Sequence, residues 1–229
     1  MIALTIACAI ACAVLVWREH SAGTRSDAKR CGGSIASPGS AGTRSDAKRC
    51  GGSIARAVAK VIASLAFVAV GVLAGGGRPW MVSGLVLGLV GDIALLGDGK
   101  RAFLAGLGAF WLGHVAYVVG IAQVVAPSEW AQPLALVPVA AGLAALAWLW
   151  PHLGSLRGPV IAYVGAIVAM TAGALAVWEP RLTIGAALFF VSDLSVARDQ
   201  FVARGFVNHA WGLPAYYAGQ LLIAWSLAT

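Results

Sequence analysis

The chain alternates between long apolar runs and short segments that carry proline, glycine or charge. An α-helix rises about 1.5 Å per residue, so about 20 apolar residues cross the hydrocarbon core of a bilayer. We expect helices over residues 1–17, 58–73, 80–97, 103–125, 134–150, 160–178, 182–197 and 213–228. The pattern therefore predicts an all-α, polytopic transmembrane helix bundle of about eight helices, which forms a single transmembrane domain over residues 1–229.

The first apolar run also has features of a secretory signal peptide, because Ala11-Cys12-Ala13 offers a small-residue cleavage site. A signal peptide carries its positive charge before the apolar region. Here the basic residues follow the run, beginning at Arg18. This order favours a first membrane helix, and seven helices are the alternative if the run is cleaved.

The composition also indicates a membrane protein. Hydrophobic residues make up 60% of the chain and charged residues 11%, whereas soluble domains are about 25% charged. These values exclude a soluble enzyme and a disulfide scaffold. Of the sixteen Lys and Arg residues, eight lie between Arg18 and Arg56 beside three acidic residues, without a nucleic-acid-binding motif. We therefore expect membrane lipids, and no nucleic acid, as partners.

The distribution of basic residues predicts the orientation in the membrane. Thirteen Lys and Arg residues lie in the connections after the first, third, fifth and seventh expected helices, and the other connections hold only Arg78 and Arg181. Basic residues are concentrated in cytoplasmic loops. Both termini should therefore lie outside the cytoplasm. We expect a multi-pass integral membrane protein, in the plasma membrane if the source is bacterial.

A tandem repeat occupies the first connection. The sixteen residues SAGTRSDAKRCGGSIA occur at 21–36 and again at 40–55. Solenoid folds need at least three repeats with apolar faces that stack, and these two repeats are mostly polar or small. We interpret residues 18–57 as a flexible, basic cytoplasmic loop that contains a duplicated segment.

Ionisable side chains inside membrane spans are costly to bury, so each is a candidate functional residue. Four occur here, accompanied by polar residues on the fourth, seventh and eighth expected helices: Lys60, Asp92, His114 and Asp193, with Tyr117, Ser192, Tyr216, Tyr217 and Gln220. From the helical rise, Asp92, Asp193 and Gln220 should lie about 6–10 Å from the cytoplasmic ends of their helices. Their shared depth predicts a polar cavity that opens to the cytoplasm.

Three other interpretations of these residues stay open. Each polar side chain taken singly would also suit a hydrogen bond between helices. Asp92, His114 and Asp193 would suit a divalent metal that activates water, although no HxxxH or HExxH spacing is present. Buried aspartates also mark ion paths in transporters, although neither an inverted repeat nor paired broken helices are evident.

Several motifs resemble the signature of the YhhN family. They are Lys60, Gly91-Asp92-Ile93-Ala94-Leu95-Leu96, Phe103, Gly106-Leu107-Gly108-Ala109-Phe110, Gly113-His114-Val115-Ala116-Tyr117, Gly185-Ala186-Ala187-Leu188-Phe189, Ser192-Asp193, and Tyr216-Tyr217-Ala218-Gly219-Gln220-Leu221-Leu222-Ile223. The resemblance runs from about Lys60 to the C-terminus. The combination of these motifs is more specific than any one of them.

The resemblance implies a helical membrane enzyme of the lysoplasmalogenase type. Such enzymes hydrolyse the vinyl-ether bond of a lysoplasmalogen, which yields a fatty aldehyde and glycerophosphoethanolamine or glycerophosphocholine. A lysophospholipid would then be the substrate. Paired carboxylates can divide such work between an acid and an anion. Asp92 and Asp193 become the catalytic candidates, and the substrate-binding candidates are Lys60, His114, Tyr117, Ser192, Tyr216 and Gln220.

No cofactor is expected for this chemistry, and no metal is required by it. The four cysteines form no CxxC motif and no cluster with histidine. Cys8 and Cys12 lie one helical turn apart in an apolar run, where cysteine usually acts as a small hydrophobic residue. The oligomeric state is not indicated by any motif.

The orientation can be tested by cysteine labelling. A membrane-impermeant maleimide applied to intact cells should leave Cys31 and Cys50 unlabelled, because the first connection should face the cytoplasm. A membrane-permeant maleimide provides the control and should label both. Ready labelling of either residue by the impermeant reagent would contradict the predicted orientation and place the first connection outside the cytoplasm.

Overall fold

A computed structural model describes residues 1–31, 42–75, 77–97 and 99–228, and most of these residues are helical. Short 3₁₀ turns and one π-helical segment complete the connections. The α-helices are α1 (Ile2–Cys31), α2 (Gly42–Ala74), α3 (Pro79–Ala94), α4 (Lys100–Ala122), α5 (Leu136–Leu149), α6 (Arg157–Val177), α7 (Pro180–Ala197) and α8 (Phe206–Trp225). The eight expected helices are therefore confirmed.

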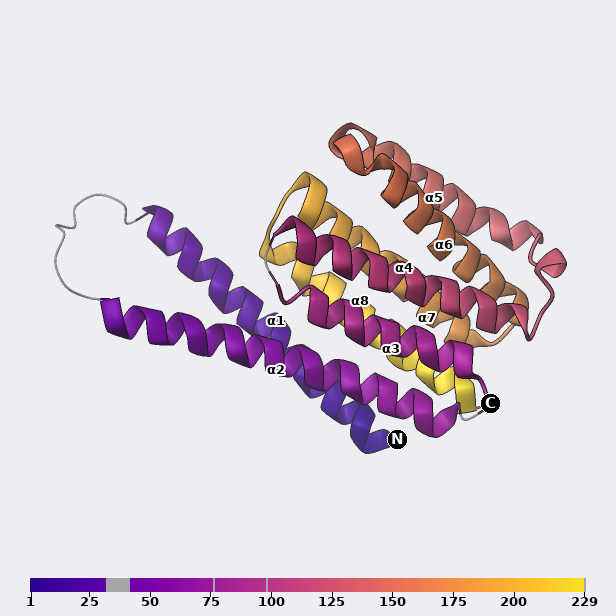
Figure 1. The fold of residues 1–229 in the computed structure, drawn as a ribbon, viewed down its shortest axis with the longest axis horizontal. Helices are drawn as coiled ribbons and strands as arrows, with labels where there is room; N and C mark the ends of the chain where they lie inside the picture. Colours follow the sequence, from indigo (N-terminus) through magenta and orange to yellow (C-terminus); the bar gives the residue numbers. More distant parts are fainter. Residues whose placement is uncertain (32–41, 76, 98, 229) are drawn as a thin grey trace.

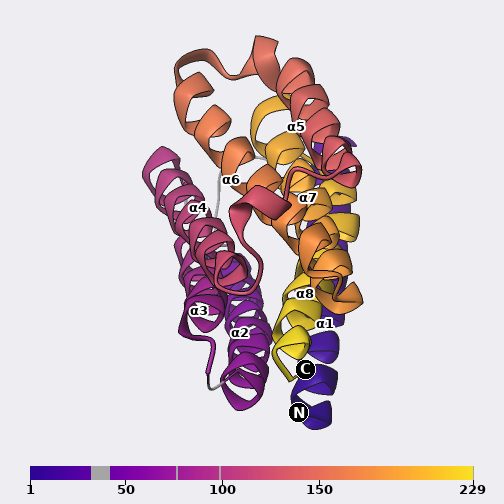
Figure 2. The ribbon, with the colours of Figure 1, turned by 90° about the vertical axis from the view of Figure 1, so that its right-hand side faces the viewer.

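The helices run up and down through one bundle (Figure 1). Successive helices pack as the hairpins α1–α2, α3–α4 and α7–α8. The α5–α6 hairpin lies at the edge of the bundle, far from both termini (Figure 2). The N- and C-termini lie at one end, and the connections after α3, α5 and α7 lie at the other (Figure 1). We call the latter the basic end, because these three connections carry five Lys and Arg residues and the first connection, which carries eight more, was assigned to the same side.

Most of the helices have the length and apolarity of membrane spans. In the described part of the chain, six helical segments are long and apolar enough to cross a bilayer, whereas α3, with 16 residues, is shorter. Large apolar side chains remain exposed on outer faces; Leu136, Val137 and Leu143 of α5 are 69%, 67% and 63% exposed. Such surfaces are stable against lipid and unfavourable in water. The all-α transmembrane bundle is confirmed.

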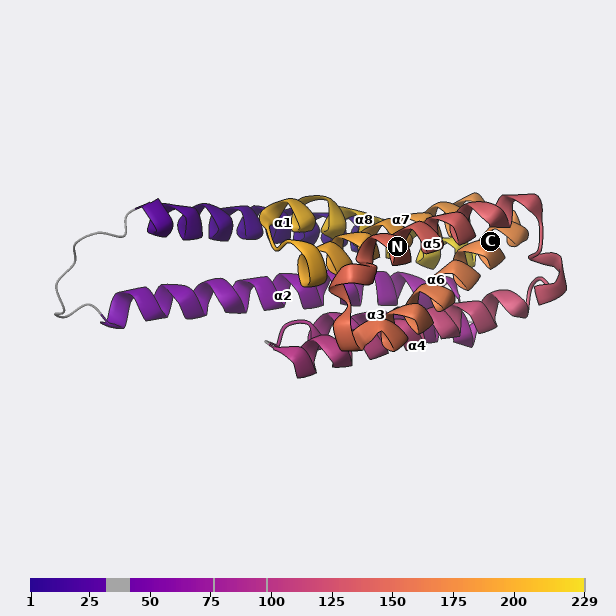
Figure 3. The ribbon, with the colours of Figure 1, turned by 90° about the horizontal axis from the view of Figure 1, so that it is seen from above.

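The first connection differs from the expected loop over residues 18–57. α1 continues to Cys31 and α2 begins at Gly42, and both run past the other helices at the basic end (Figure 3). The Ala, Lys and Arg residues of the repeat are good helix formers, and extending an existing helix avoids the cost of nucleation. Residues 32–41, which join the two repeats, lie outside the described residues.

The last helix begins earlier than the apolar pattern predicts. α8 starts at Phe206 rather than at residue 213, and it contains Pro214 in its interior. The apolar pattern did not predict this start because the first turns of α8 contain polar residues such as Asn208 and His209. Proline is tolerated in membrane helices, where neighbouring groups satisfy the freed backbone carbonyl. The earlier start gives α8 two further turns at the basic end.

Glycines of α3 allow other helices to approach it closely. A Cβ atom at Gly84 would overlap the ring of Tyr117 from α4, and one at Gly88 would lie 2.6 Å from the Gln220 side chain of α8. Tyr117 and Gln220 are fully buried and hydrogen-bonded to each other, with 2.7 Å between the Tyr117 hydroxyl and Gln220 Oε1. Gly84 and Gly88 of α3 thus make room for a buried polar contact between α4 and α8.

We expect Gly84→Ala to destabilise the protein, because the new methyl group must displace the Tyr117 ring. Overpacking of this kind costs about 1–3 kcal/mol. Gly108→Ala in α4 is the matched control, since a Cβ there meets no atom within 4 Å. Thermal unfolding in detergent should show a lower midpoint for Gly84→Ala and an unchanged or slightly raised one for Gly108→Ala. Equal midpoints for the two variants would contradict the close approach.

Candidate active site

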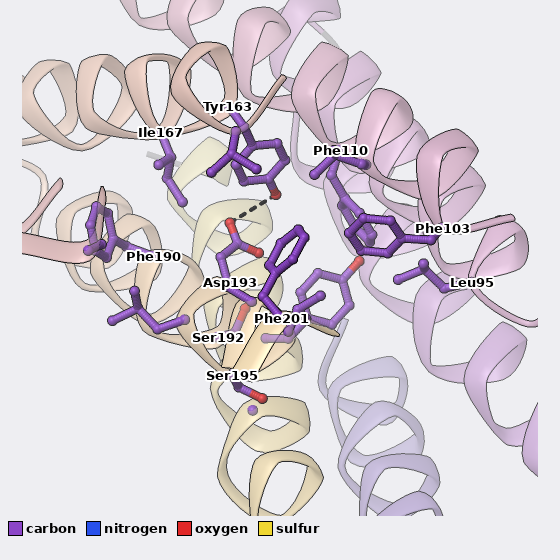
Figure 4. Close-up of a pocket in the computed structure, with 18 of the residues that line it drawn as sticks. Leu95, Phe103, Phe110, Tyr163, Ile167, Phe190, Ser192, Asp193, Ser195 and Phe201 are labelled. Carbon is purple, nitrogen blue, oxygen red and sulfur yellow. Dashed lines mark hydrogen bonds between the residues drawn. The ribbon is translucent and has the colours of Figure 1, made fainter. Parts of the chain in front are cut away.

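A cavity of about 130 Å³ lies among α2–α8 in the half of the bundle near the basic end. Its lining comes from the C-terminal turns of α3, α5 and α7 and from the N-terminal halves of α4, α6 and α8. Most of the wall is apolar. The polar lining residues come from five helices and are Lys60, Asp92, Tyr163, Ser192, Asp193, Ser195, His209 and Tyr216. Figure 4 shows the part of the cavity around Asp193.

Asp92 is held by two side chains of α2. Its side chain is 3% exposed, and its Oδ1 atom lies 3.2 Å from Nζ of Lys60. Oγ of Ser64 lies 2.6 Å from the other oxygen, Oδ2. Because Lys60 and Ser64 are four residues apart, they occupy the same face of α2. The carboxylate is therefore paired with a cation and also hydrogen-bonded, which offsets the cost of its burial.

Asp193 has different partners, from α6 and α4. The hydroxyl of Tyr163 donates a hydrogen bond to Asp193 Oδ2 at 3.0 Å, drawn as a dashed line in Figure 4. Nε2 of His114 lies 3.3 Å from the same oxygen and 3.1 Å from the Tyr163 hydroxyl. His114 is fully buried, whereas the Asp193 side chain is 18% exposed. These contacts connect three helices at one carboxylate.

Aromatic rings surround the two carboxylate clusters. The Tyr216 ring makes edge contacts with Phe110 and Phe189, at centroid distances of 5.8 and 5.4 Å. Phe189 in turn lies 4.6 Å from the His114 ring. The Tyr216 hydroxyl accepts a hydrogen bond of 3.4 Å from Gln220 Nε2. Tyr216 thus lines the cavity, and Gln220, which does not line it, holds the Tyr216 hydroxyl.

The connection between α7 and α8 lies beside the cavity. The π-helical segment Arg198–Val202 places Phe201 in the lining, where its ring meets Phe103 at 5.8 Å (Figure 4). Asn208 fastens this segment, because its amide donates to Asp199 at 2.7 Å and its Oδ1 accepts from Arg198. π-helical turns often occur at functional sites.

The structure brings only some of the candidate residues to the cavity wall. Lys60, Asp92, Ser192, Asp193 and Tyr216 line it. His114, Tyr117 and Gln220 do not; each is fully buried and contacts other polar side chains. For Gln220, the expected depth of about 10 Å was wrong: the residue follows the start of α8 by fourteen positions, or about 21 Å.

The structure also identifies residues that the sequence analysis missed. Tyr163 lines the cavity and binds Asp193, and Ser64 binds Asp92. A single tyrosine in an apolar run carries no signal of its own, since most such residues belong to the core. Ser64 had a recognisable signal, because it lies one helical turn after Lys60 within a membrane span.

The metal-site alternative finds no further support. Within the part of the chain that the structure describes, no three His, Cys, Asp or Glu residues are grouped so that they could hold a metal ion. His114 and Asp193 are in contact, but Asp92 is bound to Lys60 instead of joining them.

Comparison with known proteins identifies a family. The model of the YhhN family matches residues 55–227, which excludes most of the duplicated segment. A lysoplasmalogenase of Mycobacterium bovis is 35% identical over 159 residues, which are 64% of this chain and 59% of that protein. This chain therefore matches less than two thirds of the length of its mycobacterial relative.

Relatives from other organisms show the same range of identity. The uncharacterized membrane protein YhhN of Escherichia coli O157:H7 is 31% identical over 155 residues, which are 64% of this chain and 73% of that protein. The lysoplasmalogenase TMEM86A of Bos taurus is 32% identical over 159 residues, which are 62% of each chain. No solved structure is significantly similar to this chain.

The contact between Lys60 and Asp92 predicts a large effect on stability. Lys60→Met should destabilise the protein by about 2 kcal/mol or more, because it leaves a buried carboxylate without its cation. Lys100→Met, at an exposed position of the same end, should have little effect. The double variant Lys60→Met/Asp92→Asn should recover part of the loss. Unfolding in detergent measures all three, and additive losses in the double variant would exclude the coupling.

Proposed function

This chain belongs to the YhhN family, and we propose that it acts as a lysoplasmalogenase, the activity in the names of its mycobacterial and mammalian relatives. The substrate would be a lysophospholipid whose single chain is joined to glycerol by a vinyl ether. The products would be a fatty aldehyde and a glycerophospho-alcohol. A multi-pass membrane protein can receive such a lipid directly from the bilayer.

Hydrolysis of a vinyl ether begins with transfer of a proton to carbon. The proton adds to the alkenyl carbon farther from the oxygen, and an oxocarbenium ion forms. Water adds to this cation, and the resulting hemiacetal separates into aldehyde and alcohol. The reaction therefore requires a proton donor, a negative charge near the cation and a base for water. Two carboxylates supply these functions at glycosidic bonds, where the transition state is also oxocarbenium-like.

The observation that carries the proposal is one apolar cavity lined by two carboxylates, Asp92 from α3 and Asp193 from α7. The apolar walls suit a hydrocarbon chain. The carboxylates would act on its vinyl-ether end. In a site of low dielectric constant, charge–charge interactions are strong, so a carboxylate stabilises a nearby cation more than it would in water.

The remaining candidate residues receive supporting roles in this proposal. Tyr216 and Ser192 line the cavity, and they would contact the glycerol part of the substrate or the attacking water. Lys60 would hold Asp92 ionised and contribute positive charge on the side of the substrate phosphate. Three candidates do not line the cavity but form or connect to hydrogen bonds with residues that do, and would orient them: His114, Tyr117 and Gln220.

Replacing either carboxylate should abolish most of the activity. Asp92→Asn and Asp193→Asn preserve the side-chain shape and remove its ionisation. Each should lower turnover of a lysoplasmalogen by at least about 10²-fold, the usual contribution of a general acid or base. Purified protein in detergent or nanodiscs is assayed for release of the fatty aldehyde, and size-exclusion chromatography checks that each variant is folded.

Two controls accompany this assay. Glu129→Gln removes an exposed carboxylate outside the cavity and should leave turnover unchanged. The ester-linked lysolipid with the same head group should not be cleaved, because it has no enol carbon to protonate. Cleavage of the ester, or near-normal vinyl-ether turnover in either Asn variant, would refute the proposal as stated.

A further inference from the structure

The two carboxylates of the cavity differ in how their oxygens are engaged. Both oxygens of Asp92 have partners, Lys60 at Oδ1 and Ser64 at Oδ2. Asp193 has two partners as well, but Tyr163 and His114 both contact its Oδ2. Among the described residues, Asp193 Oδ1 has no hydrogen-bond or ion-pair partner. The pair is therefore asymmetric in charge and in geometry.

The tautomer of His114 strengthens this asymmetry. Its Nδ1 atom is buried and has no hydrogen-bond partner, whereas its Nε2 atom has two oxygens within 3.3 Å. A ring proton on Nε2 finds an acceptor, and a proton on Nδ1 would be buried unpaired. The contacts therefore favour a ring proton on Nε2 over one on Nδ1. The Nε2 proton then faces both the Tyr163 hydroxyl oxygen at 3.1 Å and Asp193 Oδ2 at 3.3 Å, so two donor groups, Nε2–H and the Tyr163 hydroxyl, converge on Oδ2.

We infer that Asp193 is the proton donor of the reaction, that its acidic proton resides on Oδ1, and that Asp92 remains ionised beside Lys60. Oδ2 already accepts from Tyr163 and His114, so a proton on that oxygen would lose one of these contacts. A proton on Oδ1 retains both. Tyr163 is then a positioning residue, which fixes the rotation of the Asp193 carboxyl group. This inference rests on the function proposed above and divides its work between the two carboxylates.

The proton and the electrons can be followed through the reaction. The alkenyl π electrons form a C–H bond with the proton from Asp193 Oδ1, and the O–H bonding pair remains on Asp193 as a carboxylate. The ether oxygen donates a lone pair, which produces the oxocarbenium ion that ionised Asp92 stabilises. Water adds to the cation and returns a proton to Asp193. The hemiacetal then loses its hydroxyl proton as the glycerol oxygen leaves and takes up a proton.

The origin of the proton can be read from the product. In D₂O, an acid held in a fixed position adds deuterium to one face of the alkenyl carbon, so the aldehyde carries one deuterium in a single configuration. Immediate reduction to the alcohol prevents exchange, and NMR of a chiral ester reports the enantiomeric excess. The wild-type protein should give one deuterium in high excess. Asp92→Asn should be slow but retain that configuration, whereas the residual product of Asp193→Asn should be racemic.

Two matched variants each remove one hydroxyl group and keep both carboxylates. They test which aspartate is the proton donor even if an Asn variant is inactive. Tyr163→Phe removes one donor from Asp193, and Ser64→Ala removes one donor from Asp92. Tyr163→Phe should lower kcat by about 10-fold, as expected for one hydrogen bond, with KM within twofold and a reduced enantiomeric excess. Ser64→Ala should retain the wild-type enantiomeric excess, whether or not its turnover rate falls.

Each outcome has a defined consequence. The inference is overturned if the enantiomeric excess is lost in Asp92→Asn or Ser64→Ala and kept in Asp193→Asn or Tyr163→Phe. Asp92 would then be the proton donor and Asp193 the ionised carboxylate. A racemic or undeuterated product from the wild-type protein would overturn it as well, while leaving vinyl-ether hydrolysis established. Absence of aldehyde from the wild-type protein would instead remove the proposed function itself.

Discussion

The structure depends on one constraint, which is that two carboxylates, one buried and one partly buried, lie inside an apolar helix bundle. A buried charge is tolerated only when other groups in the protein replace the water it has lost. Asp92 obtains these groups from α2, through Lys60 and Ser64. Asp193 obtains them from α6 and α4, through Tyr163 and His114. Each carboxylate therefore joins helices that the apolar pattern alone would leave free to rotate or slide.

The same packing that satisfies these charges also creates the cavity. Small residues of α3 let α4 and α8 approach closely, as at Gly84 and Gly88, and large aromatic rings fill the space between the clusters. The rings exclude water without competing for the carboxylates, since they offer little hydrogen bonding. An apolar site with a few convergent polar groups suits a lipid whose reactive bond lies next to its polar head.

Much of the architecture could be predicted from local patterns. Apolar runs differ so strongly in hydropathy from their connections that all eight helices were recognised, and the misplaced bounds were polar ones: the end of α1, the start of α2 and the start of α8 near Asn208. Asp92 and Asp193 stood out because ionisable residues are rare in apolar runs. Tyr163 did not stand out, because a tyrosine in such a run is chemically unremarkable until its hydroxyl meets an acceptor from another helix.

The sequence by itself thus determined the number of helices, the alternation of basic and neutral connections, and the few side chains able to carry out acid–base chemistry. These properties follow from composition and from the 1.5 Å rise of a helix, which act locally. Only the tertiary structure decided which polar groups meet. It paired Lys60 with Asp92, grouped Tyr163 and His114 on one oxygen of Asp193, and moved Gln220 behind the cavity wall. Such pairings depend on how the helices rotate and cross, and those angles are set by the packing of side chains far apart in the chain.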